Sequence, residues 1–259
     1  MDFSISKYSD LLQSLKNAGY QFQTLSGFII KPSREKVVVL RHDVDLLPEN
    51  SLRTARMEFQ LGIKGTYYFR AVPQSWNEEI IKEIHCLGHE VGYHYECLTV
   101  TNGDIPKAYE DFCMNLKRLR KLVPVTTICM HGSPRSPYDS KDIWKHYSYK
   151  DLDIIGEPYL DTDFSQVFYL TDTGRRWDGY KVSVRDKIAG QQKLWESQGL
   201  GFHSTNDVIR AIEENRLPHG IMITVHPQRW NEPGIIWVKE FISQNIKNVF
   251  KRIIVKFCK

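Results

Sequence analysis

The sequence contains no apolar run that approaches the ~20 residues of a membrane span. Its first residues include Asp2 and Asp10 and have no long apolar core, so we expect no signal peptide. Internal repeats, low-complexity stretches and Gly/Ser-rich linkers are also missing. The sequence therefore predicts one folded domain over residues 1–259, located in the cytoplasm.

The sequence also has little excess of positive over negative charge and no closely spaced pair of cysteines. The formal net charge of +4 is small for 259 residues, so it does not indicate a nucleic-acid-binding protein. The five cysteines are odd in number and form no Cys-x-x-Cys pair, which favours buried thiols in a reducing compartment. Basic residues gather in a predicted amphipathic helix at about 234–256. A solvated helix face explains them most simply, and peripheral contact with the inner face of a membrane is the alternative.

Short apolar runs alternate with helix-like runs along most of the chain. Runs such as VVVL and IMITV are typical of parallel strands that are covered on both faces. The alternation predicts an α/β fold with a parallel sheet, open or closed into a barrel. Residues 174–203 are expected to form a long functional loop or a helical insertion. The candidate strands are 37–44, 65–70, 89–96, 125–132, 153–159, 167–173 and 220–226, and the candidate helices are 6–18, 50–62, 75–87, 104–122, 140–147 and 204–215.

The first long candidate strand ends in two carboxylates. Side chains alternate across a strand, so Arg41, Asp43 and Asp45 share one face if the strand stays extended. Two carboxylates at a buried strand end repel each other and need a cation, a shared proton or a nearby arginine. A metal ion meets this need directly, with Arg41 as a partial substitute. A surface turn with solvated aspartates is the alternative.

Histidines stand at the ends of three further strands. His94 shares a strand face with Glu96, and His131 is a further ligand or substrate-contact candidate. His226, at the end of the last strand, could exchange a proton near neutral pH. Imidazoles beside carboxylates suit Zn²⁺ or a similar ion, whereas hydrogen-bonded core histidines are the alternative. Sites in parallel α/β folds lie at the carboxyl ends of the strands, so these residues are expected to meet on one rim.

The segment DTGRRWDG at 172–179 places Arg175 close to Trp177. An arginine and a tryptophan in one loop suit sugar stacking and contacts with anions. A structural ion-pair cluster is the alternative interpretation.

With these motifs, the chain resembles the NodB-homology polysaccharide deacetylases, carbohydrate esterase family 4. It is most similar to the divergent WbmS-like branch that is linked to surface polysaccharide loci. The resemblance covers roughly residues 36–230. LRHDVD (40–45) stands at the paired-aspartate motif of the family, and IKGTYYF (63–69) follows at the matching distance. GHEVGYH (88–94) is similar to the family's GHEIGNH, and ITVHPQRW (223–230) to its last-strand histidine motif.

The resemblance implies a distorted (β/α)7 barrel that removes acetyl from an N-acetylated sugar with the help of a divalent metal. It implies that Asp45 and His94 bind the metal and that His226 is the general acid. The family's catalytic-base aspartate falls on Val44, which leaves this role to Asp43.

Two further departures concern the metal set and the next motif. The family's second histidine ligand falls on Leu98, so Glu96 or His131 would have to replace it. HGSPRSP (131–137) stands in place of the family's Arg-Pro-Pro motif.

The resulting hypothesis is a metal-dependent hydrolase, with zinc as the expected ion. Asp43 would take a proton from water, and Arg41 or Arg175 would orient Asp43. The aromatic residues expected to line the sugar pocket are Tyr93, Tyr95, Trp177 and Trp230.

Three alternatives remain open from the sequence. The first is a hydrolase of the same fold that acts on another amide. The second is a catalytically silent, sugar-binding relative. The third, a sugar-modifying enzyme without a metal, is disfavoured by the carboxylate pair. The sequence identifies neither the sugar nor whether the substrate is linked to a lipid.

Overall fold

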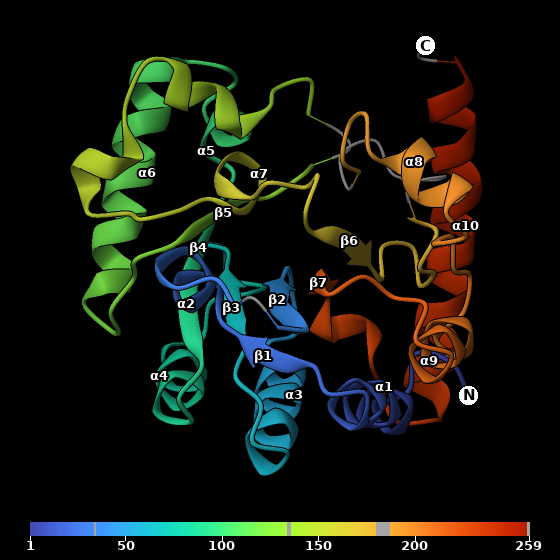
Figure 1. Cartoon of the computed structure of the whole chain (residues 1–259). Helices are drawn as coiled ribbons and strands as arrows, with labels where there is room; N and C mark the ends of the chain where they lie inside the picture. The colour runs from blue at the N-terminus through green and yellow to red at the C-terminus, as the bar shows by residue number, and fades with distance from the viewer. Residues whose placement is uncertain (34, 134–135, 180–186, 258–259) are drawn as a thin grey trace.

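The computed structural model describes residues 1–33, 35–133, 136–179 and 187–257, and a sheet of parallel strands forms its centre (Figure 1). The strand order is β5-β4-β3-β2-β7-β6, and β1 pairs with the first half of β2, ahead of β3. Every pairing is parallel, so the predicted α/β class is confirmed. The strands are β1 Gln21–Gln23, β2 Val37–Val44, β3 Thr66–Phe69, β4 Glu90–Tyr95, β5 Ile128–Met130, β6 Phe168–Thr171 and β7 Gly220–Val225.

The sheet curls into a half-barrel whose edges, β5 and β6, do not pair with each other within the described residues. The strand predicted at 153–159 is wrong, because only Gly156 forms a bridge there, to Thr127. Pro158 begins helix α7 and the Glu157 side chain caps it, so the chain turns before a strand can extend. The seventh strand is instead β1, which the sequence analysis did not predict.

The helices predicted from periodicity are confirmed to within a few residues, except that 140–147 forms a 3-10 helix. Helix α9 begins with a capping box between Ser204 and Asp207. In the segment 174–203 the structure describes helix α8, and residues 180–186 lie outside the described part. The helices are α1 Ile5–Asn17, α2 Leu25–Ile30, α3 Pro48–Gln60, α4 Glu78–Cys86, α5 Cys97–Val100, α6 Ile105–Arg120, α7 Pro158–Asp161, α8 Gln192–Ser197, α9 Thr205–Glu213 and α10 Ile235–Phe257, with 3-10 helices η1 Ser140–Lys145, η2 Tyr149–Leu152 and η4 Pro227–Arg229.

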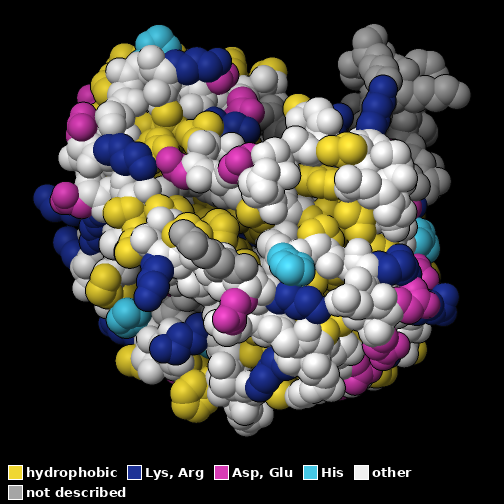
Figure 2. Space-filling model, in the orientation of Figure 1, with side chains coloured by type: hydrophobic (Ala, Val, Ile, Leu, Met, Phe, Trp, Pro, Cys, Tyr) yellow, Lys and Arg dark blue, Asp and Glu magenta, His cyan; other side chains and the backbone are white. Residues whose placement is uncertain are grey.

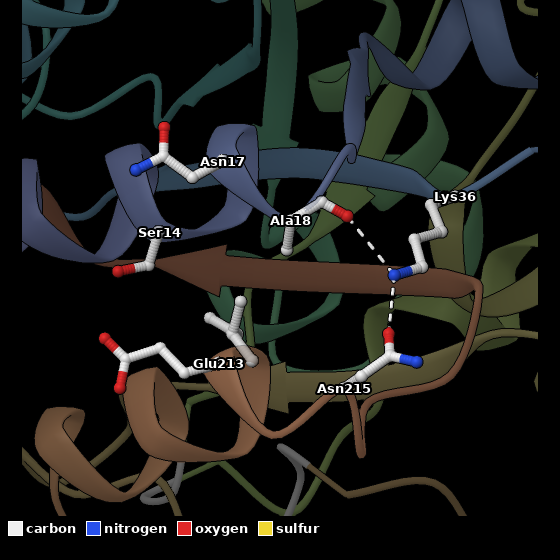
Figure 3. A pocket seen from close by; sticks show the side chains of 7 residues that line it. Ser14, Asn17, Ala18, Lys36, Glu213 and Asn215 are labelled. Carbon is white, nitrogen blue, oxygen red and sulfur yellow. Dashed lines mark hydrogen bonds between the residues drawn. The ribbon is translucent and has the colours of Figure 1, made fainter.

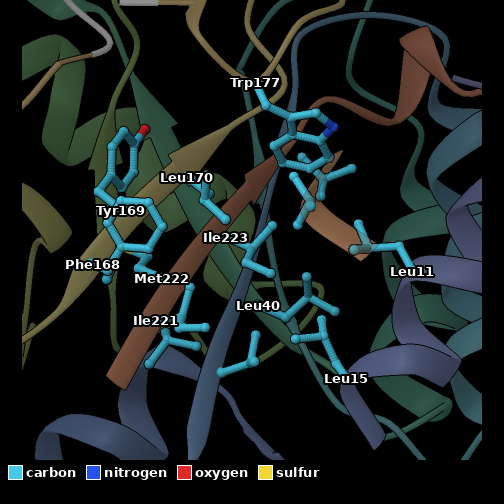
Figure 4. Close-up of a cluster of buried hydrophobic side chains, with 14 of the residues drawn as sticks. Leu11, Leu15, Leu40, Phe168, Tyr169, Leu170, Trp177, Ile221, Met222 and Ile223 are labelled. Atoms are coloured by element: carbon cyan, nitrogen blue, oxygen red, sulfur yellow. The ribbon is translucent and has the colours of Figure 1, made fainter. Parts of the chain in front are cut away.

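The core lies against both faces of the sheet, and all eight residues of β2 are buried. In one cluster Leu40 of β2 and Ile223 of β7 pack beside Leu11 and Leu15 of α1 (Figure 4). A second cluster joins β3, β4 and β5 to α4 and α6. Burial on both faces explains why these strands are nearly continuous apolar runs. Carboxylates and imidazoles gather toward the carboxyl ends of β2 and β4.

The surface carries both signs of charge. On the face shown in Figure 2, Lys and Arg side chains are interspersed with Asp and Glu. Among the described residues, no helix has both the length and the hydropathy that crossing a bilayer requires. Helix α10 runs along one outer edge of the molecule (Figure 1).

Candidate metal centre

The predicted site residues gather at the carboxyl edge of the sheet. Asp43 lies near the end of β2 and Asp45 directly after it, while His94 is on β4. His131 follows β5 and His226 follows β7. Because all these strands are parallel, their carboxyl ends meet on one rim, as the sequence predicted.

Asp45, His94 and His131 offer three atoms that could bind one ion. The Oδ1 atom of Asp45 lies 3.7 Å from Nε2 of His94 and 3.4 Å from Nε2 of His131. Oδ1 is buried and has no hydrogen-bond partner in the described part of the chain. A buried carboxylate oxygen without a partner is costly, and a cation between it and two imidazoles removes that cost. These three residues therefore fit a divalent metal.

Both histidines are held through the ring nitrogen that points away from the centre. The Nδ1–H of His94 donates to the Cys129 carbonyl oxygen at 2.9 Å, because a carbonyl can only accept. Nδ1 of His131 lies 3.0 Å from Oε2 of Glu96. Such contacts fix the ring and leave the Nε2 lone pair free for a metal.

Glu96 therefore lies behind His131. Its Oε1 atom accepts from Nε of Arg70 at 2.9 Å and from Nη2 at 2.6 Å. Arg70 also donates from Nη1 to the backbone oxygen of Asp45. The sequence left open whether Glu96 or His131 completes the metal set, and the geometry favours His131 as the ligand and Glu96 as its support.

The electrostatics of His94 and Asp45 suit a metal at neutral pH, whereas those of His131 oppose it. At His131 burial would lower the pKa, but the hydrogen bond with Glu96 and the charge of Asp45 raise it. Burial lowers the pKa of His94 to about 4, so its imidazole is neutral. Burial alone would raise the pKa of Asp45, but His131 and His226 lower it below its ordinary value. Burial would likewise raise the pKa of Glu96, but His131 and Arg70 lower it to about 2. A charged carboxylate and a neutral imidazole are the protonation states that metal ligands need.

The rim is open to solvent on the side of Asp45 and His131. Their side chains are 20% and 16% exposed, whereas that of His94 is 2% exposed. An ion bound here would keep a face toward water.

Asp43 is held by Arg41, two residues earlier on the same strand. Nε of Arg41 donates to Oδ1 at 2.8 Å and Nη2 donates to Oδ2 at 2.6 Å. Burial would raise the pKa of Asp43, but Arg41 and then His94 hold it well below its usual range. Oδ2 lies 3.7 Å from Nε2 of His94, so the carboxylate borders the metal centre.

A second group of possible ligands consists of Asp43, His94 and Cys129. It fits an ion less well, because both oxygens of Asp43 already accept from Arg41. Asp45 offers a free oxygen, and the two groups share His94. Of the two groups, Asp45, His94 and His131 therefore fit an ion better.

On the opposite side of the rim, His226 forms a pair with Asp172 of the segment after β6. Nδ1 of His226 lies 2.6 Å from Oδ1 of Asp172, and the backbone N–H of His226 donates to Oδ2. Nη1 of Arg229 and Nε1 of Trp230 also donate to this carboxylate, each at 2.7 Å. Burial would raise the pKa of Asp172, but Arg229 and His226 lower it.

This pair aims the other ring nitrogen of His226 at the centre. Nε2 of His226 lies 4.0 Å from Oδ2 of Asp45. Gln228 donates to the same Oδ2 at 3.2 Å, and its Oε1 has no partner in the described residues. The imidazole and this amide oxygen thus border the same space as Asp45.

Five residues of the predicted site are not brought to the rim. Tyr93 is buried and packs on Phe112 of α6, on the strand face opposite His94. Tyr95, on the same strand face as Tyr93, is also buried, and its hydroxyl accepts from Nε1 of Trp144. The buried Trp177 packs on Trp230, and the Trp230 indole lies behind His226 through its bond to Asp172. In this conformation none of these four aromatic residues offers a surface to a sugar. The guanidinium of Arg175 lies over Trp237 of α10, so Arg41 and not Arg175 orients Asp43.

Sequence reasoning missed Asp172 and Arg70 as parts of the site. Asp172 lies near the end of the strand predicted at 167–173 and directly after the observed β6, so the strand-end rule used for Asp43 could have found it. Arg70 ends the strand predicted at 65–70, but it carried no signal as a partner of Glu96. Residues 134–135 of the HGSPRSP motif lie outside the described residues.

A polar hollow lies at the other edge of the sheet. It is lined by residues of α1 and α9, and Nζ of Lys36 donates to the Ala18 carbonyl and to Oδ1 of Asn215 (Figure 3). Lys36 directly precedes β2, so the hollow is at the amino ends of the strands. We interpret Lys36 as a structural residue whose two hydrogen bonds link the end of α1 to the end of α9.

No protein-family model and no curated protein matches the chain. The fold is similar to a family 4 carbohydrate esterase from Bacillus anthracis, at 10% identity and TM-score 0.45, over 96% of this chain and 90% of that one. It is also similar to Bacillus subtilis PdaA, a family 4 carbohydrate esterase, at 12% identity and TM-score 0.41, over 92% and 83%. A third similar structure is a pseudoenzyme of that family from Bacillus anthracis, at 13% identity and TM-score 0.41. The match covers 84% of this chain but only 62% of the pseudoenzyme.

Proposed function

We propose that this protein is a metal-dependent hydrolase of the polysaccharide deacetylase kind. One observation carries the proposal: an unpartnered oxygen of Asp45 faces Nε2 of both His94 and His131. Beside these ligands lie a carboxylate held by arginine and an imidazole held by a carboxylate. A metal site, a base and an acid are the groups that metal-assisted hydrolysis of an amide uses.

Two side chains beside the metal centre would each carry out one proton transfer of the hydrolysis. A bound divalent ion, which we propose to be zinc, would activate water and polarise the acetyl carbonyl. Asp43, kept ionised by Arg41, would accept the proton that the water loses. His226, held by Asp172, would give a proton from Nε2 to the leaving amine. Both groups border the ligand residues: Nε2 of His226 lies 4.0 Å from Oδ2 of Asp45, and Oδ2 of Asp43 lies 3.7 Å from Nε2 of His94.

The substrate class follows from the motifs rather than from the pocket. The order of LRHDVD, GHEVGYH and ITVHPQRW supports an N-acetylated sugar in surface polysaccharide synthesis, as in the WbmS-like branch. A cytoplasmic enzyme acting on a soluble or lipid-linked sugar is consistent with this proposal. The sugar contacts would come from residues other than the buried Tyr93, Tyr95, Trp177 and Trp230.

The experiment measures the metal content of the protein and its turnover in the same samples. The purified protein is stripped, reloaded with Zn²⁺, and assayed for acetate release from N-acetylglucosamine oligomers. We expect about one zinc per chain and turnover in the loaded wild type. D45N and H131Q should lose both, whereas H219Q, an exposed histidine before β7, should keep both. Full activity in D45N or in the stripped protein would refute the proposal.

A catalytically silent relative is the second candidate. The observation in its favour is the double hydrogen bond from Arg41, which already neutralises Asp43. A protein of this kind would bind acetylated oligosaccharide without releasing acetate, with or without zinc. Stoichiometric zinc that D45N removes, together with absent turnover on several acetylated sugars and acetylated amides, would favour it.

A further inference from the structure

Helix α10 turns polar residues toward the body of the protein. The side chains of Gln244 and Asn248, one turn apart, are each only 6% exposed. Nε2 of Gln244 donates to Oδ1 of Asn248, and Nδ2 of Asn248 donates to the Gly174 carbonyl. Near the start of the helix, Nε1 of Trp237 donates to the Asp2 carbonyl. These contacts fix which side of the helix faces inward.

The outward side is apolar. Ile235, Val238, Ile242 and Ile246 are 75%, 46%, 53% and 54% exposed, and Phe241 is 45% exposed. Their spacing of three and four residues places them on one stripe along the helix. A helix on a protein surface ordinarily shows the opposite arrangement, with its apolar stripe on the core. An exposed apolar stripe of this kind indicates a binding surface for a protein partner or a membrane.

The charge of the helix indicates what kind of surface its apolar stripe binds. The sequence of α10 holds five basic residues, Lys239, Lys247, Lys251, Arg252 and Lys256, and one acidic residue, Glu240. Lys239 and Lys247 are exposed. The side chains after residue 248, and Lys259, are outside the described part. Two copies of so basic a helix would repel each other, whereas an anionic surface would attract it.

We propose that α10 is an interfacial helix that binds an anionic phospholipid membrane. Its stripe of Ile235, Val238, Ile242 and Ile246 would enter the boundary between headgroups and acyl chains. The lysines would contact the lipid phosphates. Such a helix lies in the plane of the membrane and does not span it. This inference does not depend on the hydrolase function.

The test is co-sedimentation of the full chain with vesicles. One set is phosphatidylcholine alone, and the other contains about 30 mol% phosphatidylglycerol, which supplies the negative surface charge. We expect binding to the anionic vesicles only, with a loss of about tenfold or more near 0.5 M salt, because salt screens the charges. The double variant I242S/I246S should reduce binding at low salt by about tenfold or more, because it removes apolar area.

The control variant I30S/M114S changes two exposed apolar residues on α2 and α6. It should bind anionic vesicles like the wild type. Circular dichroism and zinc content of each variant report whether the body of the protein is intact. Equal binding to both vesicle types, or unchanged binding of I242S/I246S, would overturn the proposal. A dimer in light scattering that I242S/I246S dissociates, without vesicle binding, would assign the stripe to a second copy instead.

Discussion

At the scale of single residues, the candidate centre depends on how its ligands are held. His131 has one ring nitrogen facing Asp45 and the other 3.0 Å from Glu96. Glu96 is in turn fixed by Arg70. Without this carboxylate, the His131 ring would lose the contact that sets its rotation and its tautomer.

We therefore predict that Glu96→Gln weakens zinc binding by roughly 10- to 100-fold without unfolding the protein. Isothermal titration with Zn²⁺ measures the affinity, and thermal unfolding checks the fold. Glu83→Gln is the matched control, because Glu83 forms only an exposed ion pair with Arg56. An unchanged affinity in Glu96→Gln would argue against His131 as a ligand held by Glu96.

Asp172 supports the second half of the site in the same way. Its carboxylate bonds to both the ring and the backbone of His226. We predict that Asp172→Asn lowers kcat by about 10²- to 10⁴-fold, because His226 loses the carboxylate that sets its tautomer and orientation. Zinc content should stay at the wild-type level, since Asp172 is not among the three ligand residues. Steady-state kinetics with zinc analysis would contradict the assignment if kcat stayed unchanged.

At the scale of elements, a second polar group joins α1, α3, β2 and β3. The Glu58 side chain of α3 is fully buried and lies 2.8 Å from Nε2 of His42 on β2. It accepts from Tyr8 of α1 at 2.6 Å and from Tyr67 of β3 at 2.9 Å. His89 lies 3.7 Å from its second oxygen. The carboxylate thus links the two helices α1 and α3 to the sheet.

This group makes stability depend on pH. Burial would raise the pKa of Glu58, but His42 lowers it below the ordinary value of 4.5. Burial lowers the pKa of His89 below 6.5. In both cases the unfolded chain binds more protons than the folded one, so stability is lost as pH falls. The loss begins near pH 6.5 for His89 and near pH 4.5 for Glu58.

We predict that Glu58→Gln unfolds with a free energy lower by roughly 3 kcal/mol at neutral pH, because a buried charged partner is removed. The variant should also lose less stability than the wild type between about pH 5 and pH 4, since the Glu58 titration is gone. Urea unfolding at several pH values measures both effects. The exposed Glu83→Gln change serves as the control. Parallel stability curves for wild type and Glu58→Gln would contradict this account.

The elements that sequence patterns missed are short ones. Strand β1 has three residues, QFQ, with two polar side chains, and it exists because β2 offers an unpaired edge before β3 begins. The predicted strand 153–159 had the apolar content of a strand. In the structure this segment forms only the bridge at Gly156, because Glu157 and Pro158 start a helix there. Pairing partners and caps, rather than apolar content, decided both cases.

At the scale of the whole molecule, a metal that binds only the folded chain must stabilise it. The candidate ligands come from the residue after β2, from β4 and from the segment after β5, so an ion would link distant parts of the sequence. At a free zinc concentration of about 100 times Kd, the free energy of unfolding should rise by roughly 2.7 kcal/mol. For a chain of this size that corresponds to about 5 to 10 °C in Tm.

Differential scanning calorimetry of the stripped protein, with and without zinc, measures this shift. A chelator should reverse it, and D45N should not show it. Mg²⁺ serves as the control ion, because it prefers oxygen ligands to imidazole. A Tm that zinc leaves unchanged in the wild type would exclude a specific site.

The sequence by itself determined the α/β class, because apolar runs alternate with helical periodicity along the chain. It also determined that Asp43, Asp45, His94, His131 and His226 meet on one rim, since parallel strands bring their carboxyl ends together. Only the tertiary structure shows that His131 faces Asp45 while Glu96 lies behind His131, because this depends on how side chains from separate strands pack together. It also placed Trp177 and Trp230 in the core and turned the apolar side of α10 outward, since packing against distant segments sets these orientations.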